Sequence, residues 1–239
     1  MDALRARIAD EFGLTIKHET SADAFAGYVT AARVRLGGEG VDVTGLPLFG
    51  AHINPDWSYI APHCFMATLG YWWPKLATTN TARLYEFDAP HSIRWLMESC
   101  RLWYDEPELH APLMTCEVTS DDPRMDQPVS SVIHVGTAWV HPSLRGKGLG
   151  RLMVALHRAE AFDRLKAPLM FGTTVASKDG KWTGSSAFNG TAVVRMGAKD
   201  DPNVVPEVQQ VRIYTPDSIL SDAQRIAESG INATTAQAG

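Results

Sequence analysis

The stretch that decides the fold is Val132-Ile-His-Val-Gly-Thr-Ala-Trp-Val-His-Pro-Ser-Leu-Arg-Gly-Lys-Gly-Leu-Gly-Arg151. Its first half is rich in β-branched and aromatic residues, which predicts a strand over 132–140. Its second half carries glycines at alternate positions. An amphipathic pattern then predicts a helix to about Leu165. A strand, a glycine loop and a helix therefore follow one another here.

The chemistry of this stretch lies in Gly146, Gly148 and Gly150, which directly precede the helix. Glycines let the backbone approach a ligand closely, and the first N–H groups of a helix lie at the positive end of its dipole. The loop therefore predicts a phosphate or pyrophosphate site. Its spacing matches neither G-x-x-x-x-G-K-[ST] nor G-x-G-x-x-G, which disfavours a P-loop or a dinucleotide fold.

Residues 140–150 resemble motif A of the GNAT superfamily of N-acetyltransferases, V-x-P-x-x-R-G-x-G-[LI]-G, and the resemblance extends over about residues 130–215. It implies an α/β (α+β) fold with a mixed, mostly antiparallel central sheet flanked by helices, here with an enlarged N-terminal half. It also implies that the loop binds the pyrophosphate of coenzyme A, with acetyl-CoA or another acyl-CoA as co-substrate, and that the preceding strand pairs with pantetheine. The cofactor-binding residues implied are Trp139, Val140, Arg145, Gly146, Lys147, Gly148, Leu149, Gly150 and Arg151.

The remaining pattern predicts a single domain over 1–220, with an acceptor-side half at 1–130, an acyl-CoA-binding half at 131–215 and a flexible tail at 221–239. Residues 41–80 are interrupted by prolines, so strands there are expected to be brief or to lie at an edge. The other expected elements are helices at 1–12, 21–36, 92–104 and 185–196 and strands at 14–19, 82–87, 113–119, 169–175 and 208–214.

Acyl transfer to an amine needs a base to accept the amine proton and a donor to protonate the leaving thiolate. His134 is the first candidate base, because strand alternation places it on the same face as Val140 and because histidines near this offset are implicated in related acetyltransferases. Glu117 is the second candidate. The position of the usual acid, a tyrosine, is occupied by Val193, which leaves Tyr214 or solvent to protonate the thiolate.

Composition narrows the function classes. A net charge of −5 without a long basic run argues against nucleic acid as a bulk partner. The acidic start of the chain and the lack of a long apolar run predict a cytoplasmic protein without membrane contact. Three widely spaced cysteines fit no disulfide framework or close-spaced zinc pattern, so no metal is expected, although His63 beside Cys64 could be a metal-site fragment.

The predicted function is transfer of an acetyl or other short acyl group from acyl-CoA to a primary amine of a small molecule. Three alternatives stay open: a CoA-binding sensor without catalysis, acylation of a macromolecular amine, and a metal-dependent enzyme around His52 and His63. Nine of the thirteen Trp and Tyr residues lie between residues 57 and 104, where they could line an acceptor pocket or build a core or a dimer interface. A homodimer is common among proteins of the resembling family.

Overall fold

A computed structural model describes residues 1–41, 61–72, 75–104, 107–175, 190–198 and 207–229. Within them the strands form one eight-stranded sheet in the order β1-β2-β3-β5-β6-β8-β7-β4. Only the β5–β6 pair is parallel. The expected fold class, a mixed and mostly antiparallel sheet flanked by helices, is therefore confirmed. The strands are β1 Thr15–Glu19, β2 Phe65–Trp72, β3 Lys75–His91, β4 Met114–Thr119, β5 Val129–Val140, β6 Leu169–Val175, β7 Gly190–Ala198 and β8 Glu207–Tyr214.

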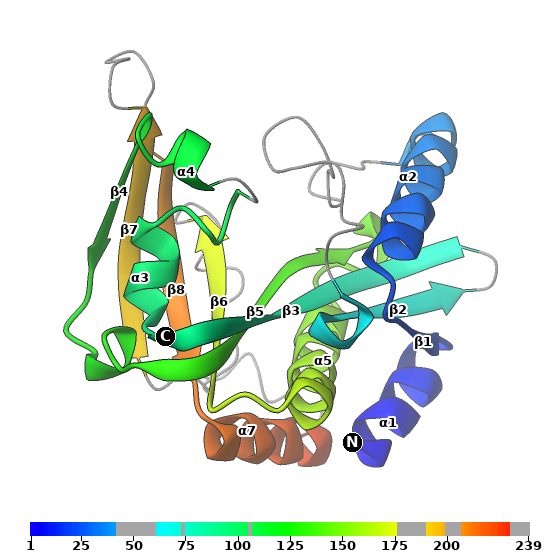
Figure 1. The fold of residues 1–239 in the computed structure, drawn as a ribbon. Helices are drawn as coiled ribbons and strands as arrows, with labels where there is room; N and C mark the ends of the chain where they lie inside the picture. Colours follow the sequence, from blue (N-terminus) through cyan, green and yellow to red (C-terminus); the bar gives the residue numbers. More distant parts are fainter. Residues whose placement is uncertain (42–60, 73–74, 105–106, 176–189, 199–206, 230–239) are drawn as a thin grey trace, which may run out of the picture.

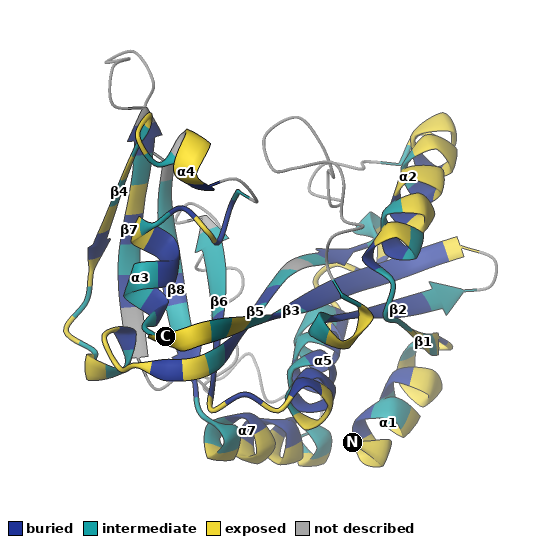
Figure 2. Cartoon of the chain, viewed as in Figure 1, coloured by how far each residue is buried: buried dark blue, intermediate teal, exposed yellow. Residues whose placement is uncertain are grey.

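One face of the sheet is covered by α5 (Leu149–Leu165), with α1 (Asp2–Phe12) and α7 (Pro216–Glu228) packed beside it (Figure 1). The side of α5 that carries Leu149, Leu152 and Leu156 is buried against the sheet, as its sequence pattern predicts. Figure 2 shows the buried band that runs along α5 and the strands behind it. This packing holds the start of α5 at the end of β5.

The opposite face carries two separate helices. The helix α2 (Ala22–Gly38) packs on β2, and α3 (Ile93–Glu98) packs on the strands around β4 and β6. Three clusters of buried residues lie beneath α5, α3 and α2, and they are called the α5 core, the α3 core and the α2 core. Successive strand residues alternate between the two faces of the sheet: on β6, Met170 lies in the α5 core and Phe171 in the α3 core. A short helix, α4 (Pro107–His110), follows α3 along the chain.

Local signals explain how the first helices begin and end. Gly13 adopts a left-handed conformation with φ 64°, and its N–H donates to the carbonyl of Ala9, which ends α1 as expected. The hydroxyl of Ser21 accepts a hydrogen bond from the N–H of Ala24 and so starts α2. This helix continues to Gly38, slightly beyond the expected end at Leu36.

The expectation of brief or edge strands within residues 41–80 is wrong for the described part of that segment. Both β2 and β3 lie inside the sheet, and β3 is 17 residues long. Apolar and polar residues do not alternate along these strands, because helices cover both of their faces. The sequence therefore lacks the alternation that would have indicated long strands inside the sheet. Even Thr78, Thr79 and Asn80 are buried. Residues 42–60 and 73–74 lie outside the described residues.

Two expected helices are also corrected. The helix expected over 92–104 ends at Glu98, and Cys100 then takes a left-handed conformation with φ 60°. The helix expected over 185–196 is a strand in its described part, because β7 pairs with β8 on one side and with β4 on the other. Ala192 and Val194 alternate into the core there. Residues 185–189 lie outside the described residues.

The segment after Ser221 was expected to be a frayed tail, but residues 221–228 form the second half of α7. Thr215 and Ser218 form a reciprocal capping box at the start of this helix. Its apolar residues Ile219, Ala223 and Ile226 are buried in the α5 core. Residues 230–239 lie outside the described residues. No helix in the described part of the chain is long and apolar enough to span a bilayer.

Candidate active site

The strands β5 and β6 separate beyond a short paired stretch, and the region between their separated ends is called the opening below. These strands pair in parallel only from Val132 opposite Leu169 to Val135 opposite Gly172. Beyond that point β5 continues to Val140 and β6 to Val175, and the two strands diverge (Figure 1). Among the described residues no strand pairs with β5 or β6 in the region between their separated ends, so an extended ligand could hydrogen-bond to their backbone groups there.

The glycine loop lies at the end of β5. Gly146 and Gly148 have φ of 75° and 84°, a region in which residues with a side chain are strained. Gly148 is the N-cap of α5, and no side chain caps this helix. The residues from Arg145 to Gly148 are exposed, and a Cβ added to Gly146 would meet nothing within 4 Å. An exposed, uncapped N-terminus of a 17-residue helix fits an anionic group such as a pyrophosphate.

The three basic residues in and after the loop, Arg145, Lys147 and Arg151, have different surroundings. Lys147 is exposed, and the Nε atom of Arg145 donates to the carbonyl of Val140 at 3.0 Å, which ties the loop to the strand end. Burial lowers the pKa of Arg151, and the charges of Arg225 and Asp222 act on the same group. Arg151 therefore belongs to the α7 side of α5.

Trp139 and Val140 offer only their backbone to a ligand in the opening. The side chain of Trp139 is buried among the α2 core residues, and that of Val140 is buried on the α5 face. Leu149, the first residue of α5, is likewise fully buried. The implied cofactor residues that the structure brings together are therefore the exposed loop residues from Arg145 to Gly148 and the backbone at the end of β5.

A β-bulge in β5 changes the expected faces. Thr79 lies opposite Trp139 and Thr81 opposite Gly136, so two steps along β3 match three along β5. The extra residue reverses the alternation, which places Val140 on the α5 face and His134 on the α3 face. The expectation that His134 and Val140 share a face is therefore wrong.

His134 nevertheless lies at the opening. Its ring stacks on Phe171 with the centroids 4.9 Å apart, and its Nε2 atom is 3.2 Å from Oγ1 of Thr173 on β6. Burial, with a smaller contribution from the nearby Arg83, lowers the pKa of His134 to about 4. The imidazole is therefore neutral at pH 7 and able to accept a proton, although its basicity is weaker than that of an exposed histidine.

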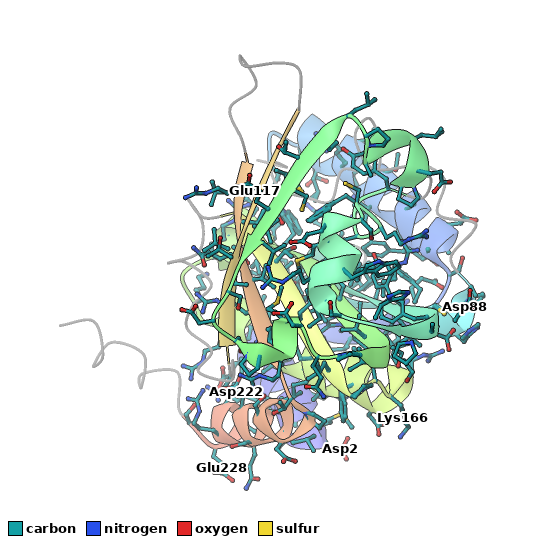
Figure 3. All side chains as sticks on the ribbon, turned by 60° about the vertical axis from the view of Figure 1, so that its left-hand side comes forward. Asp2, Asp88, Glu117, Lys166, Asp222 and Glu228 are labelled. Carbon is teal, nitrogen blue, oxygen red and sulfur yellow. The ribbon has the colours of Figure 1, made fainter. Side chains whose placement is uncertain are left out.

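The other two candidate catalytic residues lie elsewhere. Glu117 is exposed on β4, the edge strand, and faces Arg195 of β7 (Figure 3). β4 precedes β5 in the sequence, but β6, β8 and β7 lie between them in the sheet. Tyr214 is buried in the α5 core, where the Arg158 guanidinium lies 4.1 Å from its ring centroid. The structure brings neither side chain to His134.

Val193 occupies the position of the usual tyrosine only if residues 185–196 form a helix. It lies instead on β7, opposite Gln210 of β8. The comparison therefore has no structural basis. Thr173, which touches His134, is not evident as a site residue from the sequence, because the sequence does not show that β6 is the parallel neighbour of β5.

The aromatic residues before position 105 mostly build the core where they are described. Trp103 is buried and Tyr85, Trp95 and Tyr104 pack against the α3 core, while Tyr71 packs against the α2 core. This confirms the core interpretation for these residues. Trp57, Tyr59 and Trp73, like His52, lie outside the described residues.

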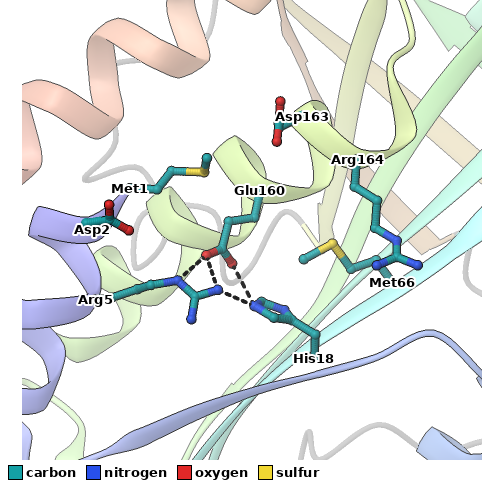
Figure 4. Close-up of a pocket in the computed structure, with 8 residues that line it drawn as sticks. All are labelled: Met1, Asp2, Arg5, His18, Met66, Glu160, Asp163 and Arg164. Atoms are coloured by element: carbon teal, nitrogen blue, oxygen red, sulfur yellow. Dashed lines mark hydrogen bonds and ion pairs between the residues drawn. The ribbon is translucent and has the colours of Figure 1, made fainter.

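A cavity of about 460 Å³ lies at the other end of α5 (Figure 4). Arg5 of α1 donates from Nε to the buried carboxylate of Glu160 at 2.7 Å, and His18 of β1 lies 3.4 Å from the same carboxylate. Glu160 is twelve residues from Gly148, about 18 Å along the helix axis. These contacts hold α1 and β1 against α5, far from the glycine loop.

No protein-family model and no curated protein matches the chain. Solved structures resemble it distantly. A polyamine N-acetyltransferase of Drosophila melanogaster shares 12% identity over 84% of this chain and 99% of its own, with a TM-score of 0.43. An N-acyl amino acid synthase from uncultured soil microbes shares 10% over 89% and 97%, with a TM-score of 0.44. A CoA-dependent acyl-homoserine lactone synthase shares 10% over 91% and 92%, with a TM-score of 0.45.

Similarity at this level carries no argument about activity, so the assignment rests on the chain's own residues. The loop at 140–150 begins a buried helix at the end of a strand that diverges from its parallel neighbour. In its loop motif and in its mixed, mostly antiparallel sheet, the chain resembles the GNAT superfamily.

Proposed function

We propose that this protein is an acyl-CoA-dependent N-acyltransferase that moves an acetyl or other short acyl group to a primary amine of a small molecule. The observation that carries the proposal is the uncapped, glycine-lined N-terminus of α5, exposed beside the opening between β5 and β6. An anion-binding loop and an adjacent opening with free strand edges suit a ligand with a pyrophosphate at one end and an extended, amide-containing arm.

The acyl-CoA is a co-substrate, and the residues present fit it. The backbone N–H groups at 146–150 would hold the pyrophosphate, with Lys147 adding a positive charge. The edge of β5 up to Val140 would bond the arm. The bulge between Gly136 and Trp139 takes backbone groups out of the ladder, where a donor could stabilise the negative charge that develops on the thioester oxygen.

In the proposed reaction the amine nitrogen forms a bond to the acyl carbon, the carbon–sulfur bond breaks, and the amine loses one proton. His134 accepts that proton directly or through a water molecule, since its imidazole is neutral at pH 7. Solvent protonates the departing thiolate, because Tyr214 is buried on the other face of the sheet. Glu117 has no role in this scheme because of its place on the edge strand.

The sensor alternative loses its main support, since Val193 lies on a strand and says nothing about a missing acid. Acylation of a macromolecular amine remains a second acceptor class for the same chemistry. Titration of acetyl-CoA by calorimetry, together with a thiol-release assay over a panel of amines, tests the proposal. Binding with amine-dependent thiol release supports it, binding without release for any amine favours the sensor, and absence of binding rejects it.

A further inference from the structure

Three side chains with metal-binding atoms meet at the surface away from the glycine loop. His63 and Cys64 lie in a 3₁₀ turn, η1 (Pro62–Cys64), immediately before β2, and Glu86 lies on β3. Their imidazole nitrogen, thiol sulfur and carboxylate oxygen all lie within 4.8 Å of one another. Sequence alone suggested only the His63–Cys64 pair, because the pairing of β2 with β3 is what brings Glu86 to it.

The two separations to the Glu86 carboxylate match those of ligands around one zinc ion. The Nε2 atom of His63 is 3.2 Å and the Sγ atom of Cys64 is 3.4 Å from Oε2 of Glu86. Tetrahedral zinc, with bonds of about 2.0 Å to nitrogen and oxygen and about 2.3 Å to sulfur, requires about 3.3 Å between nitrogen and oxygen and about 3.5 Å between sulfur and oxygen. Both contacts to Glu86 therefore lie within about 0.1 Å of the zinc values, and the nitrogen and sulfur atoms of His63 and Cys64 lie within 4.8 Å of each other.

The chemistry and exposure of the cluster also suit zinc. Thiolate and imidazole together favour zinc over magnesium or calcium, which prefer oxygen ligands. The side chains of His63 and Glu86 are 70% and 58% exposed, so an ion can reach them from solvent. Cys64 is half-buried against two core clusters, so its sulfur is held in place by packing.

The cluster is separate from the proposed acyltransfer site. Glu86 pairs with Ser131 near the start of β5, whereas the glycine loop follows Val140 at its end. Nine residues of strand separate the two positions, which corresponds to about 30 Å. His134 is three residues along β5 from Ser131, about 10 Å, so an ion at the cluster would lie outside bonding distance of its imidazole.

We propose that His63, Cys64 and Glu86 bind one zinc ion, with water as the fourth ligand, and that the ion ties the turn before β2 to β3. In the metal-free protein the Cys64 thiol donates a hydrogen bond to Glu86. Zinc replaces this bond: the sulfur binds as thiolate, and one proton is released to solvent.

The test measures zinc binding to the full-length chain by calorimetry with zinc chloride, with cobalt(II) as a spectroscopic substitute. We expect one ion per chain, a thiolate-to-cobalt charge-transfer absorption, and an unfolding temperature that rises with zinc concentration. His63→Ala, Cys64→Ser and Glu86→Gln should each weaken binding about tenfold or more, the scale on which loss of a single supporting contact already acts at metal sites. Cys64→Ser should also abolish the charge-transfer absorption.

Cys116→Ser is the matched control, because it removes another half-buried thiol, on β4, and leaves the cluster intact. It should bind zinc as the unmodified chain does. The exposed His63 side chain can be removed without disturbing packing, so His63→Ala still tests zinc binding by the cluster if Cys64→Ser fails to fold. Absence of binding, unchanged affinity in His63→Ala and Glu86→Gln, or equal loss in Cys116→Ser would overturn the proposal.

Discussion

The Nε2 atom of His134 on β5 lies 3.2 Å from Oγ1 of Thr173, the first residue of β6 beyond the paired stretch of the two strands. The contact holds the imidazole at the point where the strands begin to diverge. Stacking on Phe171 fixes the plane of the ring. A neutral imidazole in a fixed position at the opening is what a proton acceptor for the incoming amine requires.

His134→Ala should lower turnover by about 10²-fold or more while acetyl-CoA affinity is retained, because general-base groups contribute on that scale. Steady-state kinetics with calorimetric measurement of acetyl-CoA binding checks this. Thr173→Val, which removes only the hydroxyl contact, should reduce turnover less than His134→Ala. Unchanged turnover in His134→Ala would transfer proton removal to bulk water.

Gly146→Asp should abolish acetyl-CoA binding, because it places a negative charge and a side chain in the phosphate cradle. Gly40→Asp is a closely matched control. Both glycines have φ of 75° and open space where a Cβ would stand, so both variants carry similar backbone strain of about 1–2 kcal/mol. Calorimetry should show affinity lost in the first variant and kept in the second. Equal affinities would disprove the cradle.

Stability should fall as the pH falls from about 6.5 to 4, and His157 should contribute to that fall. Burial lowers the pKa of His157, which is 2% exposed, to about 4. Between these pH values the unfolded chain binds more protons than the folded one, so this contribution is complete above pH 6.5 and decreases by up to about 3 kcal/mol toward pH 4.

Urea unfolding of His157→Gln across this pH range checks the prediction, since glutamine does not titrate. The variant should lose stability less steeply with falling pH than the unmodified chain. It should keep some pH dependence, because burial lowers the pKa of His134 in the same direction. Identical slopes for the two proteins would contradict the assignment to His157.

Ile226→Ala should lower the free energy of unfolding by about 2–4 kcal/mol, because Ile226 of α7 is 1% exposed and its truncation leaves a cavity in the α5 core. Leu220→Ala, at a position on the same helix that is 52% exposed, should change stability by no more than about 0.5 kcal/mol. Chemical denaturation of both variants provides the measurement. Similar small effects would mean that α7 does not pack on α5 in solution.

The elements that the sequence predicted well are those with strong local signals. Gly13 ends α1, Ser21 caps α2, and the apolar positions from Leu149 place α5 against the sheet. The two positive-φ glycines of the loop fall where the motif has glycine, because no other residue adopts that backbone conformation without strain. These features depend on neighbours within a few residues, so a sequence pattern can reveal them.

The elements predicted wrongly depend on contacts between distant segments. The sequence of β7 predicts a helix, and only its pairing with β8 and β4 shows that it is a strand. The sequence of β3 does not alternate between apolar and polar residues, because helices cover both of its faces. Apolar periodicity reports which sides of an element are covered. It does not report which element covers them. A strand that is buried on both faces has no alternation of apolar and polar residues, so it cannot be recognised by that pattern.

By itself the sequence determined the glycine loop and the helix that follows it, since these follow from glycine conformation and apolar spacing, and its resemblance to the GNAT superfamily implied the fold class. Only the tertiary structure decided which side chains meet: Thr173 with His134, Glu86 with His63 and Cys64, and Glu117 with neither group. The order of the strands in the sheet and a single β-bulge determine which of these side chains lie in contact. Both arise from pairing between residues far apart in the chain, where local preferences carry no information.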